Sequence, residues 1–417
     1  MNQSVKDKKL YSNFISLSTV QIANYLFPLI TIPYLVRVLG AEKFGLISFA
    51  QAFILYFSLI TNYGFNLSVP RSISINRDNH LTVSNIFNSV MILRILFMCF
   101  SFILMSLIVL AFDKFKVEWI VFFFAFGIVV GEVLFPIWFF QGMEEMKNIA
   151  ILSLFSKLFY TVSVFIFVKS EVDYILVPLL NSIGAILTGL ISLWIVIKNF
   201  NISISIPSYK DLKFQLVEGG NIFISNISIS VYTISNTFIL GLFTNNIIVG
   251  YYSAAEKIIK SLQGLLNPIV QSVYPHISKL AVVSKKSAIN FINSLAKKIG
   301  VFTIILSAVV FLFSEEIINL FLGNSFQKSV TVLKILSFIP FLIGMSSVYA
   351  TLFILGFGYT KKWLIIILSA TLIDLAFVML LVWIIPLGEI GVSISWLLTE
   401  ISVVIISYLY FRNLKPK

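Results

Sequence analysis

The sequence predicts an all-α integral membrane protein with about twelve transmembrane helices, arranged as two six-helix bundles around a central cavity. Of its 417 residues, 59% are hydrophobic and only 12% are charged, whereas soluble globular domains carry about 25% charged residues. The apolar residues form runs of about 17 to 25, which is the length that a helix needs to cross a hydrocarbon core. A polar connector, residues 198–219, separates the first six runs from the last six.

The first two apolar runs meet at a short polar segment, residues 37–45. The run from about Phe14 to Val36 contains Pro28 and Pro33. We expect its helix to bend and to face protein or a cavity, where other groups satisfy the carbonyls that the prolines leave free. Because this run is long and lacks a small-residue cleavage site, we also expect it to stay in place as a span rather than to be a cleaved signal peptide.

Twelve spans and two lobes follow from the pattern of apolar runs. The predicted spans are residues 14–36, 46–64, 84–112, 117–140, 149–168, 173–197, 220–243, 247–275, 298–314, 329–356, 363–385 and 388–410. The polar connector divides them into an N-terminal lobe, residues 1–205, and a C-terminal lobe, residues 206–417.

The basic residues follow the expected topology. With the N-terminus in the cytoplasm, most of the 30 Lys and Arg residues fall in segments on the inner side, so the positive-inside rule places both termini there. The net charge of +12 needs no nucleic-acid partner, because the basic residues are scattered between apolar runs and do not gather on one soluble surface.

The two halves resemble each other weakly. A shift of 205 residues aligns LVRVLGAEKFGLISFAQAF with LGLFTNNIIVGYYSAAEKI and matches Gly45 with Gly250. A shift of 214 aligns WFFQGMEEMK with LFILGFGYTK and matches Gly142 with Gly356. Each matched pair falls on one side of the membrane, as a parallel repeat of six spans requires.

Four sequence blocks carry a resemblance to a known family. They are PLITIPYLVRVLGAEKFGLISF, NYGFNLSVPRSISINRD, PIWFFQGMEEMKNIAI and VGYYSAAEKI, in this order. Together they resemble the O-antigen and capsular polysaccharide flippases of the multidrug/oligosaccharidyl-lipid/polysaccharide exporter superfamily. The resemblance covers almost the whole chain.

That resemblance implies a function and a location. It implies a bacterial inner-membrane protein that passes a polyprenyl-diphosphate-linked oligosaccharide from the cytoplasmic to the periplasmic leaflet by alternating access. It also implies a central cavity, often cationic, and coupling to an ion gradient of H⁺ or Na⁺. The expected partners are the lipid bilayer, a polysaccharide polymerase and the chain-length machinery.

Basic residues within spans are candidates for binding the diphosphate, since a charge in the membrane is costly and calls for a partner or a function. Lys257 and Lys260 lie near the middle of the eighth span and share a helical face. In the alternative, Glu256 pairs with Lys260 and Lys257 only packs between helices. Arg94 and Lys157 lie nearer the cytoplasmic ends of their spans, where they either line the cavity or extend to the interface.

Arg37 and four carboxylates complete the candidate set. Arg37, at the outer end of the first span, is a candidate gate or exit contact; alternatively it anchors the interface or forms a salt bridge with Glu42. The carboxylates are candidates for ion coupling or gating, although each could equally pair with a lysine or a hydroxyl group for stability. They are Glu132, Glu256, Asp374 and Glu400.

No enzyme signature competes with transport. A phosphate-binding GxxxxGK[ST] loop is absent. A membrane enzyme of polysaccharide assembly would be expected to have an acidic catalytic pair or a large outer loop, whereas the outer connections here are short. The adjacent outer carboxylates Glu315 and Glu316 precede an amphipathic loop, which favours their solvation. His80 and His276 lie in separate loops without other ligands at metal-binding spacing, so we expect no metal cofactor. Two alternatives stay open: a drug or cation antiporter of the same superfamily, and a membrane enzyme of polysaccharide assembly such as a polymerase or ligase.

Overall fold

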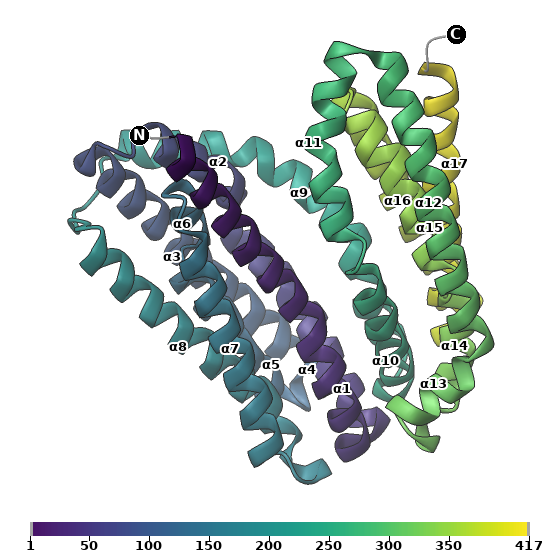
Figure 1. Ribbon diagram of the computed structural model, residues 1–417. Helices are drawn as coiled ribbons and strands as arrows, with labels where there is room; N and C mark the ends of the chain where they lie inside the picture. Colours follow the sequence, from purple (N-terminus) through teal and green to yellow (C-terminus); the bar gives the residue numbers. More distant parts are fainter. Residues whose placement is uncertain (1–2, 415–417) are drawn as a thin grey trace. The chain divides into compact units, whose positions relative to one another are not determined.

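The computed structural model describes residues 3–414, without the side chains of residues 3–15, 17–18, 221–222 and 224–234. In this part of the chain every regular element is a helix (Figure 1). Internal contacts divide the chain into two compact units. Unit 1 comprises Met1–Phe27 and Ala50–Ile227, and unit 2 comprises Pro28–Phe49 and Ser228–Lys417. Two long helices, α1 (Gln3–Asn62) and α9 (Tyr209–Phe243), contribute to both units.

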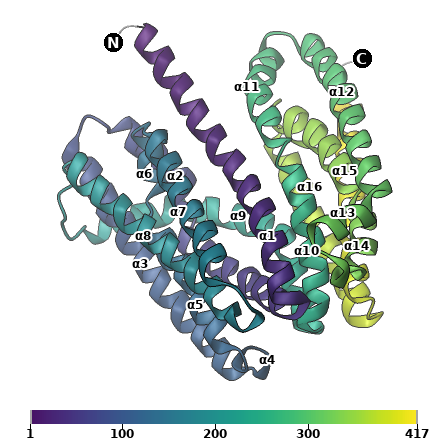
Figure 2. The same cartoon turned by 60° about the horizontal axis from the view of Figure 1, so that its bottom comes forward.

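Unit 1 is built from helices that lie alongside one another. They are α2 (Phe65–Ile75), α3 (His80–Ala111), α4 (Asp113–Lys116), α5 (Trp119–Leu134), α6 (Ile137–Gly142), α7 (Met146–Phe167), the 3-10 helix η1 (Glu171–Ile175) and α8 (Leu176–Asn199). Helices α7 and α8 run side by side, as do α3 and α5 (Figures 1 and 2). Helices satisfy their own backbone groups, which is why long apolar segments adopt them in lipid.

Unit 2 contains more short helices and two π-helical segments. Its elements are α10 (Asn246–Gln263), α11 (Asn267–Val283), α12 (Lys285–Leu312), α13 (Ser314–Phe321), the 3-10 helix η2 (Asn324–Phe326), α14 (Lys328–Leu336), α15 (Ile339–Ser346), the π-helix η3 (Ser347–Leu355), α16 (Thr360–Val378), the π-helix η4 (Met379–Ile384) and α17 (Gly388–Leu414). Helices α16 and α17 pack against each other, and α12 packs against α15 (Figure 1).

The helices have the lengths of membrane spans. Within the described residues, nine helical segments are long and apolar enough to cross a membrane, and one of them, Thr19–Ile75, contains the second predicted span and most of the first. Helix α9 covers the predicted span 220–243, and α10 with α11 covers the predicted span 247–275. The all-α membrane fold with about twelve spans is therefore confirmed, and the predicted lobe limits, 1–205 and 206–417, stay a prediction.

Helix α1 breaks at a glycine and not at its prolines. Pro28 and Pro33 lie within the helix, whereas Gly40 has the non-helical angles φ 67° and ψ 178°. Glycine adopts such a positive φ without a steric penalty. The bend that the prolines predict is thus displaced toward the polar segment. Arg71 lies in helix α2, between the second and third predicted spans.

The two glycines that the 214-residue shift aligns have different surroundings. A Cβ atom placed on Gly142 would lie 2.6 Å from Cβ of Ile73 in unit 1. One placed on Gly356 would lie 2.2 Å from the carbonyl oxygen of Leu352 and at an ordinary contact distance, 3.4 Å, from Cγ2 of Ile277 in unit 2. Both isoleucines are fully buried in the core of their unit.

Candidate functional site

In unit 2 the break in α1 packs against the start of α10 through two glycines. A Cβ atom on Gly45 would lie 1.8 Å from the carbonyl oxygen of Asn246, and one on Gly250 would lie 2.1 Å from the carbonyl oxygen of Ala41. Ala41 and Gly45 match Asn246 and Gly250 in the 205-residue shift, so the contact is symmetric between equivalent residues. Only glycine permits backbones to approach this closely.

Lys257 extends from α10 to the α1 segment of the same unit. Its Nζ atom donates a hydrogen bond to Oγ of Ser48 at 3.2 Å and lies 4.6 Å from the ring centroid of Phe44. The aromatic face attracts a cation electrostatically, more strongly where water is excluded. Lys257 is half-buried, so the α1 segment holds its ammonium group in place.

Glu256 and Lys260 form the ion pair that their spacing allows. Nζ of Lys260 lies 2.9 Å from Oε1 of Glu256, and Oγ1 of Thr237 donates to Oε2 of Glu256 at 2.9 Å. Glu256 is buried, but 45% of the Lys260 side chain remains accessible. Trp396 lies beneath it, with its ring centroid 6.0 Å from Nζ. Lys260 therefore has an acidic partner and still presents part of its charge outward.

A small polar cavity opens beside this ion pair. We call it the acidic cavity; its volume is about 90 Å³, and its lining consists of Asn236, Glu256, Lys260, Gln263, Ile343, Trp396 and Glu400. Oδ1 of Asn236 and Nε2 of Gln263 are buried and make no hydrogen bond within the described part of the chain. The cavity thus combines two carboxylates with amide groups that have unused hydrogen-bonding capacity.

Asp374 lies next to the acidic cavity and is fully buried. Oγ1 of Thr399 donates to its Oδ1 at 3.3 Å, and the side chain of Asn236 lies beside the same carboxylate. Oδ2 has no hydrogen-bond partner among the residues that the structure describes. Glu400 is close enough to repel Asp374 electrostatically and is 1% exposed. The structure therefore gathers Glu256, Asp374 and Glu400 in one region of unit 2.

Unit 1 holds a second polar group, which we call the arginine cluster: the buried Arg94 with the half-buried Asn62 and Glu132. Nη2 of Arg94 donates to Oδ1 of Asn62 at 3.0 Å and to the main-chain oxygen of Glu132 at 2.8 Å. Arg94 is 2% exposed. Its Nε and Nη1 atoms, and Oε2 of Glu132, have no hydrogen bond to any described residue. Arg94 is thus packed inside unit 1 and uses only part of its donor capacity.

Arg37 and Lys157 lie apart from both groups. Arg37 is exposed and donates to the carbonyl oxygen of Leu320, near the end of α13, where the helix carbonyls carry partial negative charge. Within the described residues it forms no salt bridge with Glu42. Lys157 is half-buried on α7, and its ammonium group contacts no acidic side chain of the described chain.

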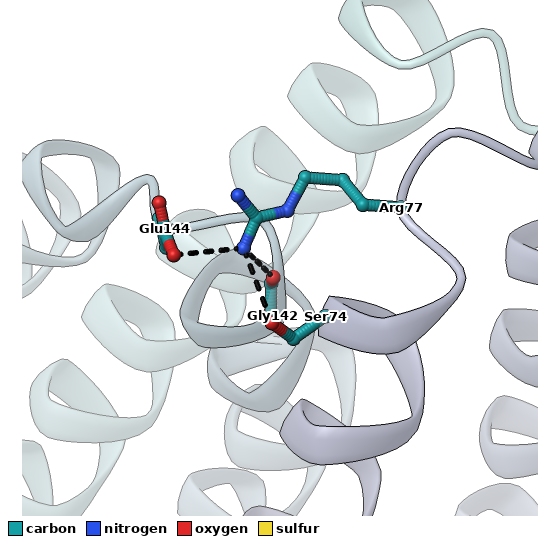
Figure 3. Close-up of polar contacts among 4 residues, drawn as sticks. All are labelled: Ser74, Arg77, Gly142 and Glu144. Carbon is teal, nitrogen blue, oxygen red and sulfur yellow. Dashed lines mark hydrogen bonds and ion pairs between the residues drawn. The ribbon is translucent and has the colours of Figure 1, made fainter. Parts of the chain in front are cut away.

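Arg77 illustrates a basic residue with a structural role. As Figure 3 shows, its Nη2 atom lies 3.0 Å from Oε1 of Glu144, donates to the carbonyl oxygen of Gly142 at 2.9 Å and reaches Oγ of Ser74 at 3.4 Å. These contacts join the turn after α2 to the turn after α6. We call them the Arg77 latch.

The candidate residues predicted from sequence are divided between the two units. Arg37, Lys257, Lys260 and three carboxylates belong to unit 2, whereas Arg94, Lys157 and Glu132 belong to unit 1. Their roles, and the shared cavity expected for the basic residues, stay predictions. Asn236, Gln263 and Thr399 were not predicted from the sequence. The candidates were chosen because ionisable residues are rare in membrane spans, whereas uncharged polar residues are common there.

Among the described residues, no three or more His, Cys, Asp or Glu side chains are grouped so that they could hold a metal ion. A monovalent cation can be bound with fewer acidic ligands. The carboxylate of Asp374 and the amide of Asn236 offer oxygen atoms of the type that hard cations prefer.

Comparison with known proteins identifies the family. Residues 10–281 match the family model described as polysaccharide biosynthesis protein. A relative from Escherichia coli strain K12, named "Putative O-antigen transporter", is 33% identical over 406 residues, which cover 97% of both chains. The chain belongs to the polysaccharide biosynthesis protein family. The resemblance carried by the four sequence blocks is therefore confirmed.

Two solved structures show how the fold of this family member is shared. An inward-facing MATE family multidrug resistance transporter of the MOP superfamily has a TM-score of 0.73 at 16% identity, covering 95% of this chain and 97% of that one. The lipid II flippase MurJ in an inward closed conformation has a TM-score of 0.69 at 15% identity, covering 96% of this chain and 87% of that one. At these identities the likeness concerns the fold.

Proposed function

We propose that this family member moves a polyprenyl-diphosphate-linked oligosaccharide from the cytoplasmic to the periplasmic leaflet without changing a covalent bond. The observation that carries the proposal is the likeness, across 97% of both chains, to a relative named for O-antigen transport. The fold shared with a lipid II flippase supports a lipid-linked substrate. The protein would act in the bacterial inner membrane with both termini in the cytoplasm, beside a polymerase and chain-length machinery.

The lysines of α10 are the proposed contacts for the diphosphate. Lys260 keeps 45% of its side chain accessible despite its pairing with Glu256, so it can bind a phosphate oxygen without first losing its partner. Lys257 lies one turn earlier and adds a second positive charge near the same helical face. Charge-assisted hydrogen bonds to phosphate are about twice as strong as neutral ones. Arg94, Lys157 and Arg37 are further proposed contacts.

Alternating access is proposed as a rocking of the lobes 1–205 and 206–417. The glycine crossing of α1 and α10 lies within unit 2, because Pro28–Phe49 belongs to that unit. This segment of α1 would therefore move together with the C-terminal lobe, and the contact of Gly45 with α10 and the hydrogen bond from Lys257 to Ser48 would persist.

The acidic cavity, with Asp374 beside it, is the proposed site of the coupling cation, H⁺ or Na⁺. Glu256, Asp374 and Glu400 are buried near one another, and like charges at such distances favour uptake of a cation. Glu132, which faces Arg94 in unit 1, is the remaining candidate and would act as a gate through that pairing.

A drug or cation antiporter is the second candidate function. The acidic cavity and the TM-score of 0.73 with a multidrug transporter favour it. The two functions differ in the charge of the transported molecule. A flippase for a diphosphate needs the α10 lysines, whereas an exporter of organic cations depends on the carboxylates and is indifferent to those lysines.

Transport by proteoliposomes would test the proposal. The protein is reconstituted with a fluorescent polyprenyl-diphosphate-linked oligosaccharide, and accessibility of the sugar to an external lectin is followed over time. We expect Lys260→Gln to lower the initial rate about tenfold, which corresponds to about 1.4 kcal/mol. Lys286→Gln is the matched control, because Lys286 is exposed on α12 outside both groups of charges.

The same vesicles can show whether Na⁺ or H⁺ is the coupling ion. With an inward Na⁺ or H⁺ gradient imposed separately, the gradient that accelerates the native protein should lose its effect in Glu400→Gln but not in Glu315→Gln, an exposed carboxylate of α13. Absence of sugar translocation by the native protein, together with export of a cationic dye that survives Lys260→Gln, would favour the antiporter.

A further inference from the structure

Unit 1 contains a polar groove that the transport proposal does not use. It lies between the end of α2, the first turns of α3 and the start of α9, and its volume is about 430 Å³. This size is within the range of about 300–1,000 Å³ that is usual for small-molecule sites. Its polar lining includes Asn76, Thr82, Asn85, Asp211 and Gln215. We call it the α2–α3–α9 groove.

Gln215 is the most informative residue of this groove. It is only 3% exposed, and its amide makes no hydrogen bond with any residue that the structure describes. Gln215 nevertheless lines the groove, so its amide is reached from there. A buried amide offers two donors and an acceptor, and burial without partners is unfavourable. The groove is thus built around an amide that is available to a ligand.

The charge of the groove's lining residues indicates whether a charged or an uncharged ligand group would bind there. Asp211 is the one charged residue among the groove's lining residues. Its Oδ2 atom accepts a hydrogen bond from Oγ of Ser208 at 2.7 Å, and no lysine or arginine lines the groove. A carboxylate repels a phosphate group, so the α2–α3–α9 groove is unsuited to the diphosphate for which the lysines of unit 2 are proposed.

Uncharged polyols match the lining well. The amides of Asn76, Asn85 and Gln215 and the hydroxyl group of Thr82 supply both donors and acceptors at several points of the wall. Neighbouring hydroxyl groups of a sugar also act as both donor and acceptor. Phe214 lies at the rim with 56% of its surface exposed, which provides an apolar face for the C–H side of a pyranose ring.

The walls of the groove are held by contacts outside it. Nδ2 of Asn88 donates to the carbonyl oxygen of Ser203 at 2.8 Å, and the main-chain N–H of Ser203 donates to Oγ of Ser84 at 3.2 Å. These bonds tie the segment before α9 to α3. The Arg77 latch fixes the turn between α2 and α3 (Figure 3). A preformed site loses less entropy on binding than one that must become ordered.

We propose that the α2–α3–α9 groove binds an uncharged sugar ring, and that this ring is part of the head group of the transported lipid. That the sugar belongs to the transported lipid rests on the proposed function, whereas binding of a sugar by the groove does not. Recognition of the neutral sugar would then rest on the amides of unit 1 and not on charged side chains.

Binding of free sugars tests the groove without any transport step. The probes are methyl glycosides of hexoses, deoxyhexoses and N-acetylhexosamines, presented one at a time to the full-length protein in lipid nanodiscs. Saturation-transfer NMR reports which sugar binds. We expect at least one sugar to give a signal with the native protein and Gln215→Leu to reduce that signal at least fivefold.

Two further variants guard against misfolding. Asn85→Ala removes an exposed groove amide and should also weaken the signal, whereas Asn199→Ala removes an exposed amide at the end of α8 and should not. Equal signals from native protein, Gln215→Leu and Asn85→Ala, or no signal from any sugar, would overturn the proposal.

The transport assay separates this proposal from the proposed function. If sugar binding depends on Gln215 but the native protein translocates no lipid-linked oligosaccharide, the groove is a sugar site in a protein of another function. If translocation proceeds while no sugar of the panel binds, the flippase proposal stands and the groove proposal fails.

Discussion

Residues 35–53 of the first half and residues 240–258 of the second half share a backbone arrangement and differ in charge. In each segment a break in the helix precedes a glycine that touches the other segment: Gly40 precedes Gly45, and Asn245, the residue before α10, precedes Gly250. The second segment carries Glu256 and Lys257 where the 205-residue shift puts Gln51 and Ala52 in the first.

This comparison distinguishes the residues that allow the two segments to pack together from the residues that are proposed to bind substrate. The contact through Gly45 and Gly250 is set by backbone atoms alone, so both copies have to keep a glycine there. Glu256 and Lys257, by contrast, have the uncharged counterparts Gln51 and Ala52. Lys257 donates a hydrogen bond to Ser48 of the other segment. A charge that is present in only one of the two segments is thus positioned by a backbone contact that both segments share.

The largest expected effect comes from breaking the crossing. Gly250→Leu would put a side chain where the carbonyl oxygen of Ala41 already lies 2.1 Å from the Cβ position, and such overpacking costs about 1–3 kcal/mol. We expect a lower thermal unfolding midpoint in detergent and an almost complete loss of transport. Gly45→Leu should behave in the same way if the crossing is symmetric.

Gly300→Ala is the control for that prediction, since its Cβ atom would meet only the sulfur of Met345 at an ordinary 3.4 Å. A normal unfolding midpoint and normal transport in Gly250→Leu would show that the two segments do not pack as described.

A smaller effect is expected from removing the asymmetric charge. Lys257→Gln loses the cation near Phe44 and weakens the bond to Ser48. We expect transport to fall about tenfold, or about 1.4 kcal/mol, with little change in the unfolding midpoint. Lys257→Arg keeps the charge and should retain most of the rate. Equal rates for the Gln and Arg variants would mean that the charge of Lys257 has no part in transport.

The smallest effect should follow substitution of Arg37, whose counterpart in the second copy is the apolar Leu242. Its hydrogen bond to Leu320 is exposed, and an exposed bond of this kind contributes about 0.5–1 kcal/mol. We expect Arg37→Gln to change the transport rate less than fivefold. Arg71→Gln, an exposed arginine of α2, serves as the control, and a loss as large as that of Lys257→Gln would assign Arg37 a direct role.

Much of the fold could be predicted from the apolar runs, because a helix that crosses lipid must be long and apolar whatever its neighbours are. The break of α1 could not be placed, since Pro28 and Pro33 fit within the helix while Gly40 takes the positive φ. Nor could the assignment of Pro28–Phe49 to unit 2 be foreseen. It depends on contacts with residues some 200 positions away in the chain, and a single sequence carries no record of them beyond the weak repeat.

Only the charged residues of the candidate site could be predicted from the sequence. Glu256, Asp374 and Glu400 could be found because charges are rare in spans, and the structure places them near one another. Gln215 and Asn236 could not, since an amide on a helix has the same sequence signature whether it lines a groove or faces solvent. Their burial, and the places where they line the groove and the acidic cavity, are visible only once the helices have packed.

The symmetric crossing also bears on the origin of the chain. In a two-fold homodimer, each contact occurs twice: a residue of one subunit touches a second residue of the partner, and the second residue of the first subunit touches the first residue of the partner. The crossing of the two segments has this form. Here Gly45 meets the residue equivalent to Ala41, and Gly250 meets Ala41 itself. An ancestral protein of half this length, pairing with an identical copy through one glycine per subunit, would leave this geometry after duplication and fusion. Once the halves were joined in one gene, one copy could gain Glu256 and Lys257 while the other kept small or neutral residues.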